Sequence, residues 1–240
     1  MTTRYAIYYS PGADTLFHKL SREWLGRDAW SGEACRQPAI EDIAELTAEP
    51  RRYGFHATLK APFQLSRSKT RQELAEFAQD FAGRHAPVML PKLRLVALDG
   101  FLALVPEVET DHLQQLAACC VMDFDSFRGP LQQEEIARRH RTGLSQRQNR
   151  LLLNWGYPHV LDQFSFHMTL SNKLTPDDMV RLRSAAETHF AAVIGVPLRL
   201  EAITIFCEAA TGGPFRAEER FALTGKADAA WPEIWKLGVR

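Results

Sequence analysis

The feature that most constrains this chain is a short phrase that occurs twice. Residues 53–60 read YGFHATLK and residues 164–171 read FSFHMTLS, so each stretch places a histidine and a threonine two positions apart in an otherwise apolar run. One such pair on a strand is more often structural than catalytic. Two pairs in one chain raise the question of whether the sequence around them is repeated as well.

The register downstream of the two motifs indicates that a whole structural unit is repeated. Each motif is followed by a loop and by a predicted helix that begins at a capping threonine, Thr70 in the first copy and Thr175 in the second. Leu93 follows Thr70 by 23 residues, Leu198 follows Thr175 by the same number, and both leucines open a Leu-Arg-Leu strand. The copies differ in the loop after the histidine, where insertions cost little. We infer a duplicated strand–helix–strand–strand unit.

The order of the predicted elements favours an α+β fold. Each unit has one helix and a hairpin-like pair of strands, and the first hairpin turns at Asp99-Gly100. The sequence therefore predicts a single bilobal domain over 1–240, with two antiparallel β-sheets, helices on the outer faces and a central cleft. We expect a first lobe over 1–110, a helical connector over 111–155 and a second lobe over 156–240. The connector carries the basic run 138–150, for which a solvated helix is the expectation and a phosphate-facing patch the alternative.

Strand alternation places the histidine and the threonine of each motif on one face. Successive side chains of a strand point to opposite sides, so His56 and Thr58 share a face, as do His167 and Thr169. The apolar residues between them would fill the core. If the two units pack about a pseudo-two-fold axis, both polar faces meet in one cleft that holds two imidazoles and two hydroxyls.

This set of side chains suits hydrolysis of a phosphodiester without a metal. An imidazole with an ordinary pKa near ~6.5 can take or give a proton near neutral pH, so one histidine could activate water while the other protonates the leaving oxygen. The threonine hydroxyls could donate hydrogen bonds to the non-bridging phosphate oxygens. A catalytic zinc site needs a third strong ligand, which this set lacks. We expect no metal and no cofactor, and the symmetric site does not distinguish the acid from the base.

The paired stretches FHATL and FHMTL resemble the two H-x-T motifs of the two-histidine (2H) phosphoesterase superfamily. In addition, RRYGFHATLKAPF, DGFLALVP, WGYPHV and FSFHMTLS are similar to a bacterial branch encoded beside phosphonate-utilisation genes. The resemblance implies a bilobal fold with the four motif residues in the cleft. It carries the catalytic roles onto His56 and His167, and the substrate contacts onto Thr58 and Thr169. It also implies a cyclic phosphate of a sugar, formed in phosphonate breakdown, as one candidate substrate.

Further side chains near the motifs are candidates for contacts to substrate. By alternation, Lys60 falls on the face of the first motif and could reach a second phosphate or a sugar oxygen. Tyr8 and Tyr157 could form walls or bind a sugar hydroxyl, and Arg216 lies in a predicted Gly-rich loop. One arginine of the pair at 51–52 could bind phosphate. For each of these residues, packing or exposure to solvent is the alternative.

Composition and charge limit the partners. The 240 residues carry 29 basic and 29 acidic side chains, so bulk charge gives no reason to expect binding to long nucleic acid, whereas a small phosphorylated substrate needs only a local cluster of donors. No apolar run approaches the ~20 residues of a membrane span. The N-terminus also lacks the order of a signal peptide. We therefore expect a cytoplasmic protein without a membrane partner; its oligomeric state is open.

Two other functions would use the same cleft. The first is a non-catalytic module that binds a nucleotide or another phosphorylated ligand, against which two titrating imidazoles argue, because binding alone needs only donors. The second is action on RNA ends, as a 2′,3′-cyclic phosphodiesterase or a 2′,5′-ligase-like protein. Steep dependence of affinity on salt would distinguish an RNA substrate from a small one.

Overall fold

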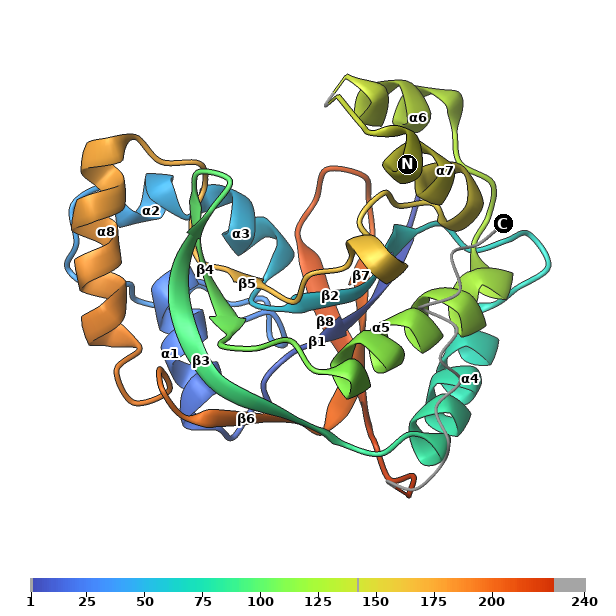
Figure 1. The fold of residues 1–240 in the computed structure, drawn as a ribbon, viewed down its shortest axis with the longest axis horizontal. Coiled ribbons are helices and arrows are strands. Elements are labelled where there is room, and N and C mark those ends of the chain that lie inside the picture. Colours follow the sequence, from blue (N-terminus) through green and yellow to red (C-terminus); the bar gives the residue numbers. More distant parts are fainter. Residues whose placement is uncertain (1, 142, 227–240) are drawn as a thin grey trace.

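The computed structural model describes residues 2–141 and 143–226 (Figure 1). The strands are β1 (Arg4–Tyr9), β2 (Ala57–Phe63), β3 (Val88–Leu98), β4 (Phe101–Pro106), β5 (Met168–Thr169), β6 (Pro197–Leu200), β7 (Ala202–Glu208) and β8 (Phe215–Ala222). The helices are α1 (Leu16–Leu25), α2 (Ile43–Leu46), α3 (Ala48–Tyr53), α4 (Arg71–Arg84), α5 (Asp111–Asp123), α6 (Gln133–His140), α7 (Gln146–Trp155) and α8 (Pro176–His189). Two short 3-10 turns, η1 (Phe124–Phe127) and η2 (Leu161–Gln163), complete the assignment.

The repeated helices begin where the sequence predicts. The Thr70 side chain accepts a hydrogen bond from the backbone N–H of Glu73 and completes a capping box at the start of α4. In the second copy, the Thr175 side chain accepts from the N–H of Asp178, and Pro176 occupies the first turn of α8. The predicted starts of both helices are confirmed. The strands that follow do not open in the predicted register, because β3 begins at Val88, before Leu93, whereas β6 begins at Pro197, next to Leu198.

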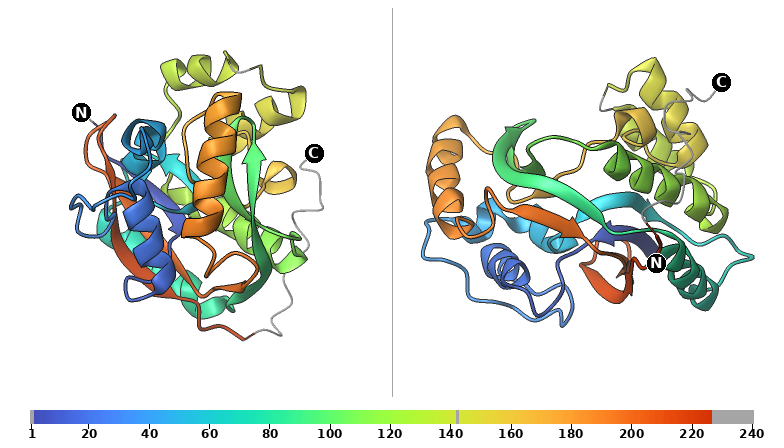
Figure 2. Two further views of the ribbon diagram at one scale, coloured as in Figure 1. Left: turned by 90° about the vertical axis from the view of Figure 1, so that its left-hand side faces the viewer. Right: turned by 60° about the horizontal axis from the view of Figure 1, so that its bottom comes forward.

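The strands form one eight-stranded antiparallel sheet in the order β6-β3-β4-β5-β2-β1-β7-β8. The predicted antiparallel α+β fold is confirmed. The two sheets expected from the sequence are joined, because β2 of the first copy pairs directly with β5 of the second. The sheet is strongly curved, with α4 and α8 far apart on its outer side (Figures 1 and 2).

The two copies exchange elements within this sheet. The hairpin β3–β4 of the first copy lies next to β5, whereas the hairpin β7–β8 of the second copy lies next to β1 and β2. Helix α4 contacts β7 and β8, and α8 contacts β3 and β4. Each half of the sheet therefore combines elements of both copies. The ranges 1–110, 111–155 and 156–240 describe the repeat along the chain; as lobes they stay a prediction, and they do not coincide with the two halves of the sheet.

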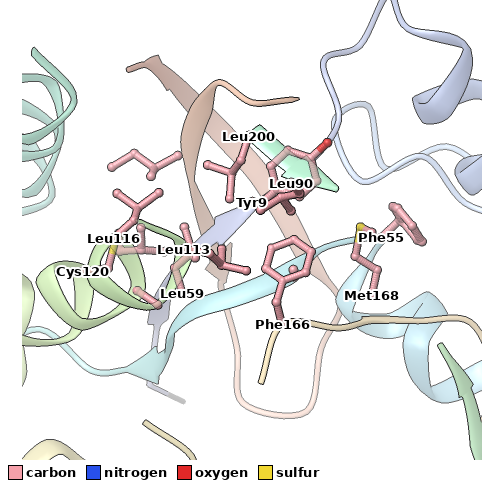
Figure 3. Close-up of a cluster of buried hydrophobic side chains, with 14 of the residues drawn as sticks. Tyr9, Phe55, Leu59, Leu90, Leu113, Leu116, Cys120, Phe166, Met168 and Leu200 are labelled. Atoms are coloured by element: carbon pink, nitrogen blue, oxygen red, sulfur yellow. The ribbon is translucent and has the colours of Figure 1, made fainter. Parts of the chain in front are cut away.

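The apolar faces of both motifs are buried in one core. Leu59, Phe166 and Met168 are at most 1% exposed and pack in the same cluster as Leu113 and Leu116 of α5 (Figure 3). Part of the predicted connector is thus core, because α5 packs on β2. Helix α6, in contrast, has no buried residue. Within the two described ranges, no helix has the length and apolar character needed to span a membrane.

Candidate active site

The two H-x-T motifs lie on neighbouring strands. β2 and β5 run antiparallel with Ala57 opposite Met168. Extending this register by one residue in each direction places His56 beside Thr169, and His167 beside Thr58. Side chains at directly opposite positions of an antiparallel pair have Cβ atoms about 5 Å apart. The structure therefore brings the four predicted side chains together around a local two-fold axis through the central pair.

Both imidazoles are held in the same way by the backbone. The Nδ1 atom of His56 lies 2.8 Å from the carbonyl oxygen of Gly54, and the Nδ1 atom of His167 lies 2.9 Å from the carbonyl oxygen of Ser165. A carbonyl oxygen only accepts hydrogen bonds, so Nδ1 carries a proton in each ring. In the neutral imidazole this leaves the lone pair on Nε2, the atom turned away from its own backbone.

The environment of His56 favours the neutral imidazole. Its ring stacks on Tyr8 with centroids 3.8 Å apart and an angle of 18° between the planes, and Tyr8 is itself buried. Burial lowers the pKa of His56 to about 4; the bond to the Gly54 carbonyl opposes this shift, and the neighbouring charge of His167 adds to it. At neutral pH, His56 is therefore a proton acceptor.

A cavity of about 750 Å³ opens above this pair of strands. His56, Thr58 and Thr169 line it. His167 is not among the lining residues; its ring centroid is 6.0 Å from that of Phe101, which does line the cavity. In Figure 1, β2 and β5 cross in the middle of the molecule, with α3 on one side and α6 and α7 on the other. The remaining lining residues are Arg4, Tyr8, Glu49, Pro50, Arg52, Tyr53, Gly54, Ala61, Pro62, Arg138, Arg139, Tyr157, Ser171 and Lys173.

The charged residues of the cavity wall are mostly basic. Of the lining side chains in the described part of the chain, five are cationic and one, Glu49, is acidic; the cations are Arg4, Arg52, Arg138, Arg139 and Lys173. The motif phrases contained no signal for Arg4 or Lys173. Arg52 belongs to the pair at 51–52, and its partner Arg51 instead donates to backbone carbonyls of Leu25 and Ala44.

The basic run 138–150 divides into two parts. Arg138 and Arg139 line the cavity from a helix that has no buried residue, and contact of these two side chains with a phosphate stays a prediction. Arg147, further along, forms an ion pair with Asp162 away from the cavity. Helical spacing alone did not reveal this division, because it depends on where α6 lies against the sheet.

Both tyrosine candidates line the cavity. Tyr8 covers one face of the His56 ring, as described above. Tyr157 lies under the guanidinium of Arg139, whose central carbon is 4.7 Å from the ring centroid. Burial raises the pKa of the Tyr157 hydroxyl, so this hydroxyl stays protonated and can donate a hydrogen bond. Contacts of either tyrosine to a substrate stay predictions.

Lys60 does not line the cavity, contrary to the expectation from alternation. Its side chain is 3% exposed, and its Nζ atom donates to the carbonyl of Val121 at 2.7 Å and to the carboxylate of Asp125 at 3.1 Å. Ala61 and Pro62 line the cavity in its place. Lys60 therefore ties β2 to the end of α5.

A β-bulge in β2 explains why the alternation of side chains did not place Lys60 correctly. Tyr8 pairs with Thr58, but the preceding residue Ile7 pairs with Lys60, so Leu59 is an extra residue on β2. An extra residue interrupts the two-residue alternation of side chains. Beyond this bulge, a position two residues after the threonine no longer shares its face.

Arg216 also lies outside the cavity. It is on strand β8 and not in the preceding Gly-rich loop, and its guanidinium donates to the backbone carbonyl of Ser31. The sequence placed Arg216 near the site from loop composition alone. Its actual neighbour is determined by the packing of the 27–34 segment against β8, which no local pattern indicates.

Within residues 2–141 and 143–226, no three histidine, cysteine, aspartate or glutamate side chains come together in a way that could hold a metal ion.

Several solved structures are similar to this chain in outline. Escherichia coli LigT complexed with 3′-AMP is 15% identical with a TM-score of 0.44, and the match covers 93% of this chain and 99% of that one. TT0787 of Thermus thermophilus is 14% identical with a TM-score of 0.43 and the same coverage. Likenesses this distant transfer no function.

Two curated relatives are much closer in sequence. Ribose 1,5-bisphosphate phosphokinase PhnN of Janthinobacterium sp. (strain Marseille) is 40% identical over 237 residues, which is 95% of this chain and 52% of that protein. The protein of the same name from Laribacter hongkongensis (strain HLHK9) is 33% identical over 215 residues, 89% of this chain and 50% of that protein. The chain thus spans about half the length of the curated relatives that it matches. A family model described as "Protein of unknown function (DUF1045)" matches residues 58–216, and the chain belongs to this DUF1045 family.

Proposed function

We propose that this protein is a metal-independent phosphoesterase that hydrolyses a cyclic phosphodiester by paired-histidine acid/base catalysis. The observation that carries the proposal is the antiparallel pairing of the two H-x-T strands, which sets two imidazoles with identical backbone anchors beside two threonines. Neither threonine hydroxyl is hydrogen-bonded to another side chain or carbonyl among the described residues, so both are available to a phosphate.

The different surroundings of the two histidines favour His56 as the general base and His167 as the general acid. Neutral His56 takes a proton from water through Nε2 as the water oxygen forms a bond to phosphorus. Protonated His167 gives its Nε2 proton to the leaving ring oxygen as the bond from that oxygen to phosphorus breaks. Thr58 and Thr169 donate to the non-bridging oxygens, where negative charge develops. At the end of one turnover His56 is protonated and His167 is neutral, and exchange of protons with solvent restores the starting state.

A plot of kcat/KM against pH is expected to be bell-shaped, and its acidic limb is expected at an unusually low pH. Activity falls as the pH drops through about 4, because protonated His56 has lost its lone pair. It falls again at higher pH, where the general acid is no longer protonated. A pH–rate profile of the free protein measures both limbs. An acidic limb at ~6.5, the ordinary imidazole value, would reject the assignment of His56 as the base, and a flat profile would reject the paired mechanism.

The names of the curated relatives suggest the substrate. Both relatives are named for phosphorylation of ribose 1,5-bisphosphate, and this chain matches about half of each. The chain contains no G-x-x-x-x-G-K-[ST] phosphate-binding loop, so we assign the kinase reaction to the other half of those proteins. Hydrolysis of ribose 5-phosphate 1,2-cyclic phosphate at the bond between phosphorus and O2 yields ribose 1,5-bisphosphate, the compound that such a kinase would consume. We therefore propose this cyclic phosphate, a product of phosphonate breakdown, as the substrate.

A hydrolysis screen tests the proposed function. It compares ribose cyclic phosphates with 2′,3′-cyclic nucleotides and with RNA ends that carry a 2′,3′-cyclic phosphate, and it uses the double variant His56→Ala with His167→Ala as the blank. Turnover of a ribose cyclic phosphate above the blank is the expected result. Preference for RNA ends would replace the substrate assignment, and calorimetric binding of these compounds without any turnover would favour a binding module.

A further inference from the structure

The cavity has two chemically different ends. From His56, β2 runs past Thr58 to Ala61 and Pro62 and there approaches the start of β1, where Arg4 lies. At the opposite end, beyond His56, the wall is formed by Glu49, Pro50, Phe101, Ser171 and Lys173. The end near Arg4 is the arginine end, and its basic residues are Arg4, Arg52, Arg138 and Arg139.

The arginine end has more basic groups than carboxylates. Glu208, which is 0% exposed, accepts from Arg4 at 2.5 Å and from Arg52 at 2.9 Å. Glu135 lies 3.7 Å from Arg138 and 3.2 Å from Arg139. Each carboxylate thus serves two guanidinium groups. Among residues 2–141 and 143–226, these ion pairs join two carboxylates to four guanidinium groups at this end of the cavity.

Two guanidinium groups at the arginine end, those of Arg52 and Arg139, are held in place by an ion pair and an aromatic ring, whereas the Arg138 side chain is 60% exposed. Arg52 is fixed by Glu208 and by stacking on Tyr53, with its central carbon 4.2 Å from the ring centroid. Arg139 is fixed in the same manner by Glu135 and by Tyr157. A planar guanidinium that rests on an aromatic ring can offer its N–H edge to the two oxygens of a phosphate, and little side-chain freedom is lost on binding.

The reacting phosphate does not require these arginines. A cyclic phosphodiester carries one negative charge, and at the H-x-T strands it meets protonated His167 and two threonine hydroxyls. A terminal phosphomonoester carries about −1.5 to −2 charges at neutral pH and three acceptor oxygens, which suits the excess of basic groups at the arginine end.

We propose that the arginine end binds a second phosphate group, a terminal phosphomonoester of the substrate, and thereby selects cyclic phosphates that carry one. This inference rests on the proposed function and adds to it a specificity-determining subsite built from α6, α3 and the start of β1. It assigns to Arg138 and Arg139 the recognition of the phosphomonoester and to Glu208 the positioning of Arg4 and Arg52.

The test compares two substrates that differ only in the second phosphate, ribose 5-phosphate 1,2-cyclic phosphate and ribose 1,2-cyclic phosphate. The variant is Arg138→Gln with Arg139→Gln, which keeps polar side chains on α6. Its matched control is Arg150→Gln, at an exposed arginine of α7 that does not line the cavity.

In the native protein we expect kcat/KM to be about 100-fold higher for the phosphorylated substrate, since two charge-assisted contacts are lost without the phosphate. The double variant is expected to lose most of this preference, with kcat/KM for the unphosphorylated substrate changed less than about 3-fold. The control keeps the native preference.

Failure of the subsite and failure of the proposed function give different results. Hydrolysis of both substrates with equal kcat/KM, or an equal loss on both in the double variant, overturns the subsite and leaves the phosphoesterase in place. If the native protein hydrolyses neither substrate, the proposed function fails, and calorimetry with ribose 5-phosphate then decides the subsite alone. Binding that is about 10-fold or more weaker in the double variant than in the Arg150→Gln control supports the subsite, and equal binding in the two variants rejects it.

Discussion

Replacement of His56 by alanine is expected to lower turnover about 100-fold or more, because a positioned general base contributes roughly 10²–10⁴-fold. Replacement of His167 is expected to cost a similar factor through loss of the general acid. The double variant should be little worse than either single one, since the two groups act in one step. Rates measured with the best substrate of the screen test this, with His112→Ala, an exposed histidine at the start of α5, as the matched control.

Two outcomes would contradict the paired-histidine mechanism. Full activity of both single variants would show that neither imidazole takes part in the reaction. Loss of activity on treatment of the native protein with EDTA would point to a metal, whereas the proposed mechanism predicts no effect of a chelator. Circular dichroism of each variant separates a catalytic loss from unfolding.

Replacement of Gly54 by alanine is expected to damage both stability and catalysis. Gly54 has φ 75° and ψ 165°, a backbone conformation that is open almost only to glycine. An added Cβ would also lie 2.6 Å from the Cβ of Ala29. We expect the free energy of unfolding to fall by about 2 kcal/mol or more, from roughly 1–3 kcal/mol of backbone strain plus the clash. Because the Gly54 carbonyl holds Nδ1 of His56, any shift of this peptide also misdirects the imidazole, and kcat falls.

Gly83→Ala provides the matched control for this prediction. Gly83 lies in α4, and an added Cβ there would meet no atom within 4 Å. Alanine at such a helical position is expected to stabilise by roughly 0.5–1 kcal/mol. Denaturant unfolding of the two variants gives the comparison. Equal stabilities would show that the conformation of Gly54 does not constrain the chain.

Local patterns in the sequence predicted a large part of this protein. The two capping threonines predicted the starts of the repeated helices, and α4 and α8 begin directly after those residues. Alternation around each histidine correctly separated the buried face, with Phe166 and Met168, from the polar face. These features follow from a few neighbouring residues, so sequence spacing is enough to read them.

The exchange of hairpins could not be read in the same way. Each hairpin is predicted well by its own residues, including the Asp99-Gly100 turn, where both residues have positive φ. Which sheet neighbour a hairpin chooses depends on the packing of the whole chain. The direct pairing of β2 with β5, which places the two histidines on adjacent strands, depends on the packing of the whole chain in the same way.

The sequence by itself determined the repeated unit and the two H-x-T pairs, because periodicity and capping act over a few residues. The tertiary structure decided the walls of the site. Because β2 bulges where it pairs with β1, the Lys60 side chain is buried and forms an ion pair with Asp125. The position of α6 places Arg138 and Arg139 at the cavity. The buried carboxylate of Glu208 joined Arg4 to Arg52, two residues 48 positions apart in the chain. Such contacts join segments that are distant in the chain, and their free energy depends on burial and charge that arise only when these segments meet.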